Sequence, residues 1–191
     1  MRTFAPPPTQ VPPLEEGANP QRFSPQWIKW FNDIANRDLY YGIFYSLEEH
    51  TLEVPGQEQA IAFELVQDHV QVAIPDKGTK IRFTASGLYQ IVFSGRVTSI
   101  GGDLVLWLRK NGVDVPASGI RTALRGVSGE YVTLRAIHAI NGGDYLEVIW
   151  LPENEFTTFT PVAAVPQTTP AVPSVRIEIT QIELWDVYKR F

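Results

Sequence analysis

The stretch Phe83–Gly119, FTASGLYQIVFSGRVTSIGGDLVLWLRKNGVDVPASG, decides the fold of this 191-residue chain. It contains long runs in which apolar and polar residues alternate, separated by the turn-forming pairs Gly101-Gly102 and Asn111-Gly112. Alternation with a period of two is typical of β-strands that are buried on one side. The stretch therefore predicts antiparallel strands that are joined by tight turns.

The run Asp103–Leu108 departs from this alternation because both of its sides are apolar. Its three leucines share one side, and Val105 and Trp107 share the other. An antiparallel sheet usually leaves one face to water, so a strand with two apolar sides needs cover on both. We expect the leucines to fill the interior of each protomer, and we expect Val105 and Trp107 to form an interface that sister chains shield.

Alternating runs continue from residue 59 to the end of the chain, with turn signals between them, and this pattern predicts a sandwich or barrel over residues 59–191. Five prolines fall between Pro152 and Pro173. Because proline lacks a backbone donor, it does not sit in a central strand. This segment is therefore predicted to be a surface loop, with a neighbouring subunit as one candidate contact.

Residues 1–24 are so rich in proline that they predict an extended arm without a core of its own. The following segment is 25–58. Ser24, just before it, can cap a helix, and Pro25 suits the first position of that helix. A short amphipathic helix is predicted, and the apolar residues at helical spacing are Trp27, Ile28, Trp30, Phe31 and Ile34. One interpretation is that this side folds back on its own domain. The other, which we favour, is that it docks onto a larger partner.

The composition excludes several classes of protein. A net charge of -5 gives no basic surface for nucleic acid. The chain has no cysteine, which excludes disulfides and thiolate metal sites. No apolar run approaches the roughly 20 residues that span a bilayer. The N-terminus also lacks the charged-then-apolar pattern of a signal peptide. We therefore expect neither a nucleic-acid partner nor a membrane span nor secretion by a signal peptide.

We find no catalytic constellation in the sequence. The three histidines lie far apart, and there is neither a nucleophile-elbow motif nor a phosphate-binding loop. Acidic residues near turns leave a carboxylate-dependent, polysaccharide-degrading enzyme as an alternative, and these acids are Asp103, Glu147, Glu153 and Glu155. We expect a protein that is not an enzyme, with no catalytic residue, metal or cofactor.

The order of several short motifs resembles the tumour necrosis factor and complement globular-head superfamily. These motifs are F-x-x-S-G-x-Y-x-I-x-F-S from Phe83, W-L-R-K-N-G from Trp107, N-G-G-D-Y-L-E-V from Asn141 and S-V-R-I-E-I-T from Ser174. The resemblance spans roughly Gln59 to Leu184. It implies an antiparallel jelly-roll sandwich that assembles as a compact homotrimer and binds partners rather than catalysing a reaction.

The N-terminal segment, with FAPPPTQVPPLEEG from Phe4 and the pattern W-x-x-W-F from Trp27, resembles the start of small structural proteins of tailed-bacteriophage particles. This resemblance implies a virion protein, a head fibre, capsid decoration or tail-associated protein, whose partners are its own copies and other proteins of the capsid or tail. The alternative in the binding class is a head that recognises a receptor or host surface glycan. Its candidate ligand contacts are aromatic residues expected to be exposed near loop tips, namely Tyr131, Phe156 and Phe159.

Overall fold

A computed structural model of the chain describes residues 26–28, 40–75, 78–126 and 128–184. The chain divides into two units, Met1–Leu39 and Tyr40–Phe191. In the first unit the described residues 26–28 are helical, and they include Trp27 and Ile28 of the predicted helix. Trp30, Phe31 and Ile34, together with the arm 1–24, lie outside the described residues.

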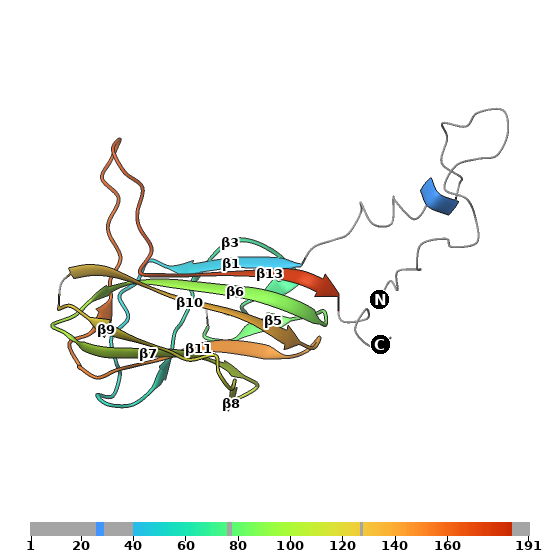
Figure 1. Ribbon diagram of the computed structural model, residues 1–191. Coiled ribbons are helices and arrows are strands. Elements are labelled where there is room, and N and C mark those ends of the chain that lie inside the picture. Colours follow the sequence, from blue (N-terminus) through green and yellow to red (C-terminus); the bar gives the residue numbers. More distant parts are fainter. Residues whose placement is uncertain (1–25, 29–39, 76–77, 127, 185–191) are drawn as a thin grey trace. The chain divides into compact units, whose positions relative to one another are not determined.

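The second unit is a sandwich of two antiparallel sheets (Figure 1). In the first sheet the strand order is β10-β6-β13-β1-β3, and β12 also pairs with β6. Its strands are β1 (Tyr41–Ser46), β3 (Leu65–Val70), β6 (Gly87–Thr98), β10 (Ser128–Ile140), β12 (Thr158–Phe159) and β13 (Val175–Leu184). The antiparallel sandwich predicted from the sequence is therefore confirmed, and its arrangement is that of a jelly roll.

The second sheet has the order β4-β5-β11-β7-β8, with β2 paired to β11 and β9 paired to β7. Its strands are β2 (Gln59–Ala60), β4 (Val72–Ala73), β5 (Ile81–Phe83), β7 (Gly102–Lys110), β8 (Val113–Asp114), β9 (Ile120–Leu124) and β11 (Tyr145–Pro152). The turn Asn111-Gly112, in which both residues have positive φ, joins β7 to β8 as the sequence predicts.

The core lies between the two sheets and follows the alternation of their strands. On β6 the inward residues include Tyr89, Ile91 and Phe93, none of which is exposed. The three leucines of β7 face them from the second sheet and are at most 1% exposed, as expected. Burial of side chains of this size contributes about 1.5–3 kcal/mol each, so this interior is the main source of stability.

Phe159 on β12 is the largest departure from the predicted surface. Instead of lying at an exposed loop tip, its ring is fully buried, with its centroid 6.0 Å from that of Phe93 and 5.0 Å from that of Trp150. Gly95 makes this possible, because a Cβ at that position would lie 2.4 Å from Cε1 of Phe159. The assignment of Phe159 as a ligand contact is therefore wrong.

The sandwich also begins earlier than predicted, at Tyr40 rather than at residue 59. Strand β1 pairs with β13 on one side and with β3 on the other, and its Phe44 is fully buried. The outward residues of β1 are Tyr41, Ile43 and Tyr45, which are as apolar as its inward ones. This strand therefore shows no alternation of apolar with polar residues. For that reason the sequence predicts a connecting segment here and not a strand.

We predict that Phe159→Ala lowers the free energy of unfolding by about 3–5 kcal/mol, because it opens a cavity between the sheets. The matched control is Phe156→Ala, only three residues away, where the side chain is 62% exposed. That change should stay within about 0.5 kcal/mol of the wild type. Urea denaturation of both variants measures the difference, and equal losses would contradict the placement of the two rings.

Candidate interaction surfaces

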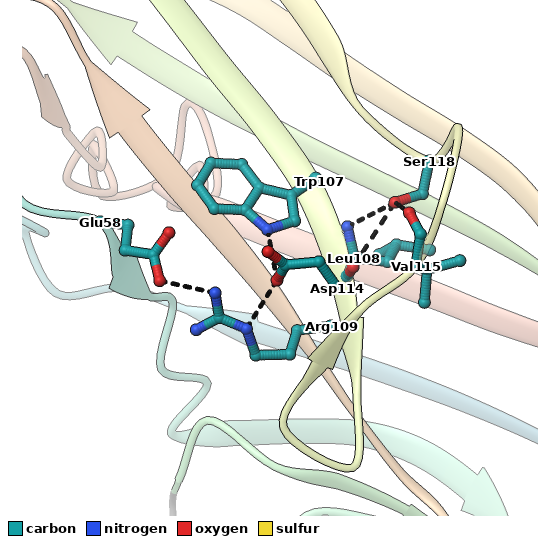
Figure 2. A network of polar contacts seen from close by, with 7 residues as sticks. All are labelled: Glu58, Trp107, Leu108, Arg109, Asp114, Val115 and Ser118. Carbon is teal, nitrogen blue, oxygen red and sulfur yellow. Dashed lines mark hydrogen bonds and ion pairs between the residues drawn. The ribbon is translucent and has the colours of Figure 1, made fainter.

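The outward side of β7 carries a polar network around Trp107 (Figure 2). The indole Nε1 of Trp107 donates a hydrogen bond to Oδ1 of Asp114 at 2.9 Å, and Nε of Arg109 donates to the same oxygen at 2.7 Å. Arg109 also forms an ion pair with Glu58 at 2.6 Å. Hydrogen bonds from Arg109 and Trp107 lower the pKa of the Asp114 carboxyl from its ordinary value.

This network belongs to a hairpin in which β8 pairs with β7 of the same protomer. The amide of Leu108 donates to Oγ of Ser118, and that hydroxyl donates to the carbonyl oxygen of Val115, so the returning chain is fastened to the strand (Figure 2). Asp114 therefore reaches the Trp107 indole from the chain's own β8.

A single protomer already covers much of the Trp107 side. Val105 and Trp107 are half-buried, and Ile149, which pairs with Trp107 from β11 on the same outward side, is only 1% exposed. The sequence predicts that sister chains shield Val105 and Trp107 on this side. The chain's own residues supply part of this cover, and the assignment of Val105 and Trp107 to a trimer interface stays a prediction.

The outward side of the first sheet is more exposed. We call the outward-pointing residues of β10, β6, β13 and β1 the front face. Tyr131 and Ile137 on β10 are 65% and 62% exposed, and Ile182 on β13 is 42% exposed. The outer edge of β10 has no strand partner among the described residues. A long edge strand with exposed apolar side chains is typical of a surface that meets another chain.

Charges on the front face are dispersed among apolar side chains. The register places Arg135 opposite Val92, Val92 opposite Glu178, and Glu178 opposite Ile43. Charges of both signs thus lie in the same row, two strands apart, with an apolar residue between them. The front face therefore has no block of like charge that would repel a second copy of itself.

A projecting hairpin, residues 160–174, rises from one end of this sheet. In Figure 1 it extends beyond β10, β6, β13 and β1, on the side away from β7 and β11. Residues 162–170 are all exposed, which confirms the surface loop predicted from the prolines. The segment 156–175 contains no Asp, Glu, Lys or Arg, although such residues make up 19% of the chain.

The base of the hairpin is fastened by Arg96 of β6. Its guanidinium donates to the carbonyl oxygen of Thr160 at 3.1 Å and to the Thr160 hydroxyl at 3.0 Å. The Arg96 amide donates to the carbonyl oxygen of Ser174 at 2.8 Å, and the Arg96 carbonyl accepts from the Thr160 amide. Ser174 is fully buried and donates to the carbonyl oxygen of Ser46. Both ends of the hairpin are therefore fixed to the sheet.

The arms beyond this base have few contacts. Val162 and Val172 exchange two backbone hydrogen bonds of 2.9 Å, and Val165 bonds to Thr169 near the tip. Val162 and Val165 are 39% and 53% exposed. An isolated two-stranded hairpin is marginally stable in water. The arms therefore expose apolar side chains and rely on very little packing.

Two of the three predicted ligand contacts are exposed at the end of the sandwich that contains Thr98. Tyr131 lies opposite Arg96 in the register of β10 and β6, and Phe156 precedes β12, which pairs with Thr98 and Val97. The amide of Phe156 donates to Oδ1 of Asn154, which turns the chain at this loop. The structure thus brings Tyr131 and Phe156 to one end of the molecule and sends Phe159 into the core.

Two of the acids that suggested an enzyme, Glu147 and Glu153, accept structural hydrogen bonds. Glu147 is buried and accepts a hydrogen bond from the Thr79 hydroxyl at 2.9 Å. Oε2 of Glu153 accepts from the Asp103 amide at 2.9 Å. Within the described residues, no group of three or more His, Asp or Glu side chains is placed to hold a metal ion.

Two histidines are desolvated within the sandwich. Burial lowers the pKa of His50 from its ordinary value of 6.5, against the opposing effect of Glu64 and Glu48. Burial also lowers the pKa of His138, and the positive charge of Lys110 adds to this while Asp144 opposes it. Nε2 of each ring is buried and has no hydrogen-bond partner within the described part of the chain. Both rings are therefore neutral at pH 7.

One open hollow of about 470 Å³ lies away from all the predicted site residues. Its lining residues are Pro75, Gly78, Thr79, Lys80 and Arg82. The Lys80 ammonium lies 4.7 Å from the centre of the Tyr145 ring, which already provides a contact for this charge.

In the parts of the chain that the structure describes, no helix is long and apolar enough to cross a bilayer.

Comparison with known proteins gives similarities among solved structures only. No protein-family model matches the sequence, and no curated protein matches it. The globular domain of the zebrafish complement 1qA protein is similar in structure, with a TM-score of 0.45 and 12% identity, over 75% of this chain and 96% of that one. At these values no functional argument rests on the similarity, and the fold class is defined by the arrangement of the strands.

We predict that the free energy of unfolding decreases as the pH falls from 6.5 towards 5, because the unfolded chain binds protons that the buried His50 and His138 resist. Well above pH 6.5 both states are neutral at these sites and the effect vanishes. Replacing His138 by Gln should reduce this pH dependence. The matched control is His69→Gln, at an exposed position on β3, which should leave it unchanged. Urea denaturation across this range measures both, and an unchanged slope in H138Q would contradict the burial of His138.

Proposed function

We propose that the protein is a non-enzymatic structural protein of a tailed-bacteriophage particle. In this proposal the sandwich self-associates as a homotrimer, and the N-terminal arm and helix attach it to other proteins of the capsid or tail. The protein would serve as a head fibre, capsid decoration or tail-associated protein. It would reach the outside of the cell as part of the virion.

The observation that carries the proposal is the pair of exposed surfaces on the sandwich. The front face displays Tyr131, Ile137 and Ile182, and the projecting hairpin adds an uncharged surface beside it. Apolar surface of this kind is typical of protein–protein contacts. These surfaces add a candidate contact to the one that the sequence predicts at Val105 and Trp107.

The attachment part of the proposal is supported by the N-terminal segment. It forms a unit apart from the sandwich, and its described residues 26–28 are helical, with Ile28 47% exposed. A tryptophan-rich segment that follows a proline-rich sequence fits the role of an anchor, since aromatic residues dominate the energetics of interfaces. The virion setting and the number of three copies come from the sequence resemblances.

We predict that Trp27→Ala combined with Trp30→Ala in the full chain weakens attachment to the particle about thirtyfold. This corresponds to the roughly 2 kcal/mol that truncation of a central interface aromatic costs. The sandwich should keep its thermal unfolding temperature. Val113→Ala, at a 71% exposed position on β8, is the control. Quantifying the protein in purified particles provides the measurement, and undiminished incorporation would refute the anchor.

A second candidate function is recognition of a host surface glycan, and the exposure of Tyr131 and Phe156 favours it. Both rings lie at the Thr98 end of the sandwich and are 65% and 62% exposed. Exposed aromatic rings of this kind offer flat apolar faces to a ligand. Recognition and a structural role are compatible in one virion protein.

For this second function we predict saturable binding to a host surface polysaccharide that is lost in Phe156→Ala or Tyr131→Ala and kept in Val113→Ala. A glycan array followed by titration of the strongest ligand gives the measurement. Equal binding by all variants would show that the ligand does not contact these rings. Turnover of the polysaccharide that stops on replacing Glu153 would instead favour the carboxylate-dependent enzyme.

A further inference from the structure

The projecting hairpin, residues 160–174, is the feature that the fold alone does not explain. A surface loop between β12 and β13 could lie flat against the sandwich, yet residues 162–170, which include the first arm and the tip, are exposed. Its valines gain little from burial within the protomer, since Val165 is 53% exposed. Its base is nevertheless held by the Arg96 guanidinium and the buried Ser174. A firmly held base under an exposed, apolar tip is suited to an arm that packs on another molecule.

The composition of the hairpin restricts what that molecule is. Segment 156–175 contains no charged residue, so a strongly charged partner gains no ion pair with it. Each copy of this protein carries a net charge of -5, so two copies carry a net electrostatic repulsion. The hairpin is a part of the surface where this repulsion is weakest. A second copy of the chain is the partner that this neutrality fits.

The same protomer also displays a surface that is complementary to the hairpin. The front face carries exposed Tyr131 and Ile137, and its charges of both signs are separated by apolar residues. Tyr131 lies opposite Arg96, the residue that holds the base of the hairpin, so the front face and the hairpin base adjoin. In Figure 1 the hairpin rises away from this face, so its tip does not pack on its own sheet.

The dimensions of the two surfaces agree. The arm from Pro161 to Pro166 spans about 17 Å at roughly 3.3 Å per residue. Along β10, Tyr131 and Ile137 are separated by about 20 Å on the same scale. A hairpin from a neighbouring copy is therefore long enough to lie along most of the front face.

We propose that the projecting hairpin, residues 160–174, is an intersubunit arm whose tip at Val165 packs on the front face of a second copy of this chain, at Ile137 of β10. This inference rests on the self-association in the proposed function but is independent of the virion setting. It names the contact that holds the copies together.

The test uses charges placed on the two sides of the proposed contact in the full-length protein. Sedimentation equilibrium measures the self-association of the wild type, of Val165→Asp and of Ile137→Lys. Each single variant should weaken self-association at least tenfold, because it places an unpaired charge against an apolar surface. The variant that combines V165D with I137K in one chain should recover most of the wild-type association, since the two new charges then face each other between copies.

The matched control combines V165D with Val113→Lys, which adds the same positive charge on β8, outside the front face. Val113 is 71% exposed, so the charge is tolerated there, and no recovery is expected. All the substituted positions are exposed, and thermal unfolding of each variant confirms that it is folded. Equal recovery in this control would show that net charge and not a specific contact governs the association.

The possible outcomes separate this inference from the proposed function. A wild type that remains a monomer at all concentrations refutes the self-association, and the arm with it. A wild-type oligomer that V165D does not weaken leaves the self-association intact and overturns the arm alone, which then has a different occupant. Weakening by V165D without recovery in the V165D and I137K chain overturns the assignment of the front face as the receiving surface.

Discussion

The pairing of strand β6 is the constraint on which the rest of the structure depends. β10 occupies one of its edges from Gly87 to Thr98, so β12 and β13 must share the other. β12 pairs at Thr98 and Val97, and β13 begins its pairing at Gly95. The chain between them leaves and re-enters the sheet at Arg96, whose backbone and guanidinium bind both ends. The segment between β12 and β13 therefore starts and ends at the same point of the sheet.

The same few residues connect this projection to the core. Phe159, the last residue of β12, fills the space above Gly95 and contacts Trp150 of the opposite sheet. The next residue, Thr160, is already held on the outer side by Arg96. Burial of one ring thus fixes where the hairpin starts, and the front face beside it stays open. On the opposite sheet Asp114 of the neighbouring strand β8 binds the Trp107 indole, so the two faces of the sandwich differ in what they offer a partner.

The sequence predicts the strands of this protein better than it predicts which surfaces are covered. Alternation and the Asn111-Gly112 turn identify β6, β7 and their connections, because one buried side leaves a clear periodic signal. β1 escapes detection because its outward Tyr41, Ile43 and Tyr45 are apolar as well. The cover over Trp107 depends on Asp114 and on an ion pair between Arg109 and Glu58, residues 51 positions apart. A local pattern contains no information on such a pair.

Phe156 and Phe159 show the same limit at the candidate site. Both phenylalanines lie in the same short segment after Pro152, and no sequence pattern in that segment distinguishes the buried ring from the exposed one. The difference is made by Gly95 on β6, which leaves room for one ring and is far away in the sequence. The hairpin was recognisable as a surface loop from its prolines. Its direction and its anchoring at Arg96 required the strand order.

The proposed assembly requires that a second copy of the chain covers the projecting hairpin. Hydrogen–deuterium exchange of the full-length protein, followed at increasing protein concentration, measures this cover directly. We expect the amides of Val162, Val165 and Val172, together with those of β10, to become protected as the concentration rises. Amides of the hairpin that exchange equally fast at every concentration would contradict the account.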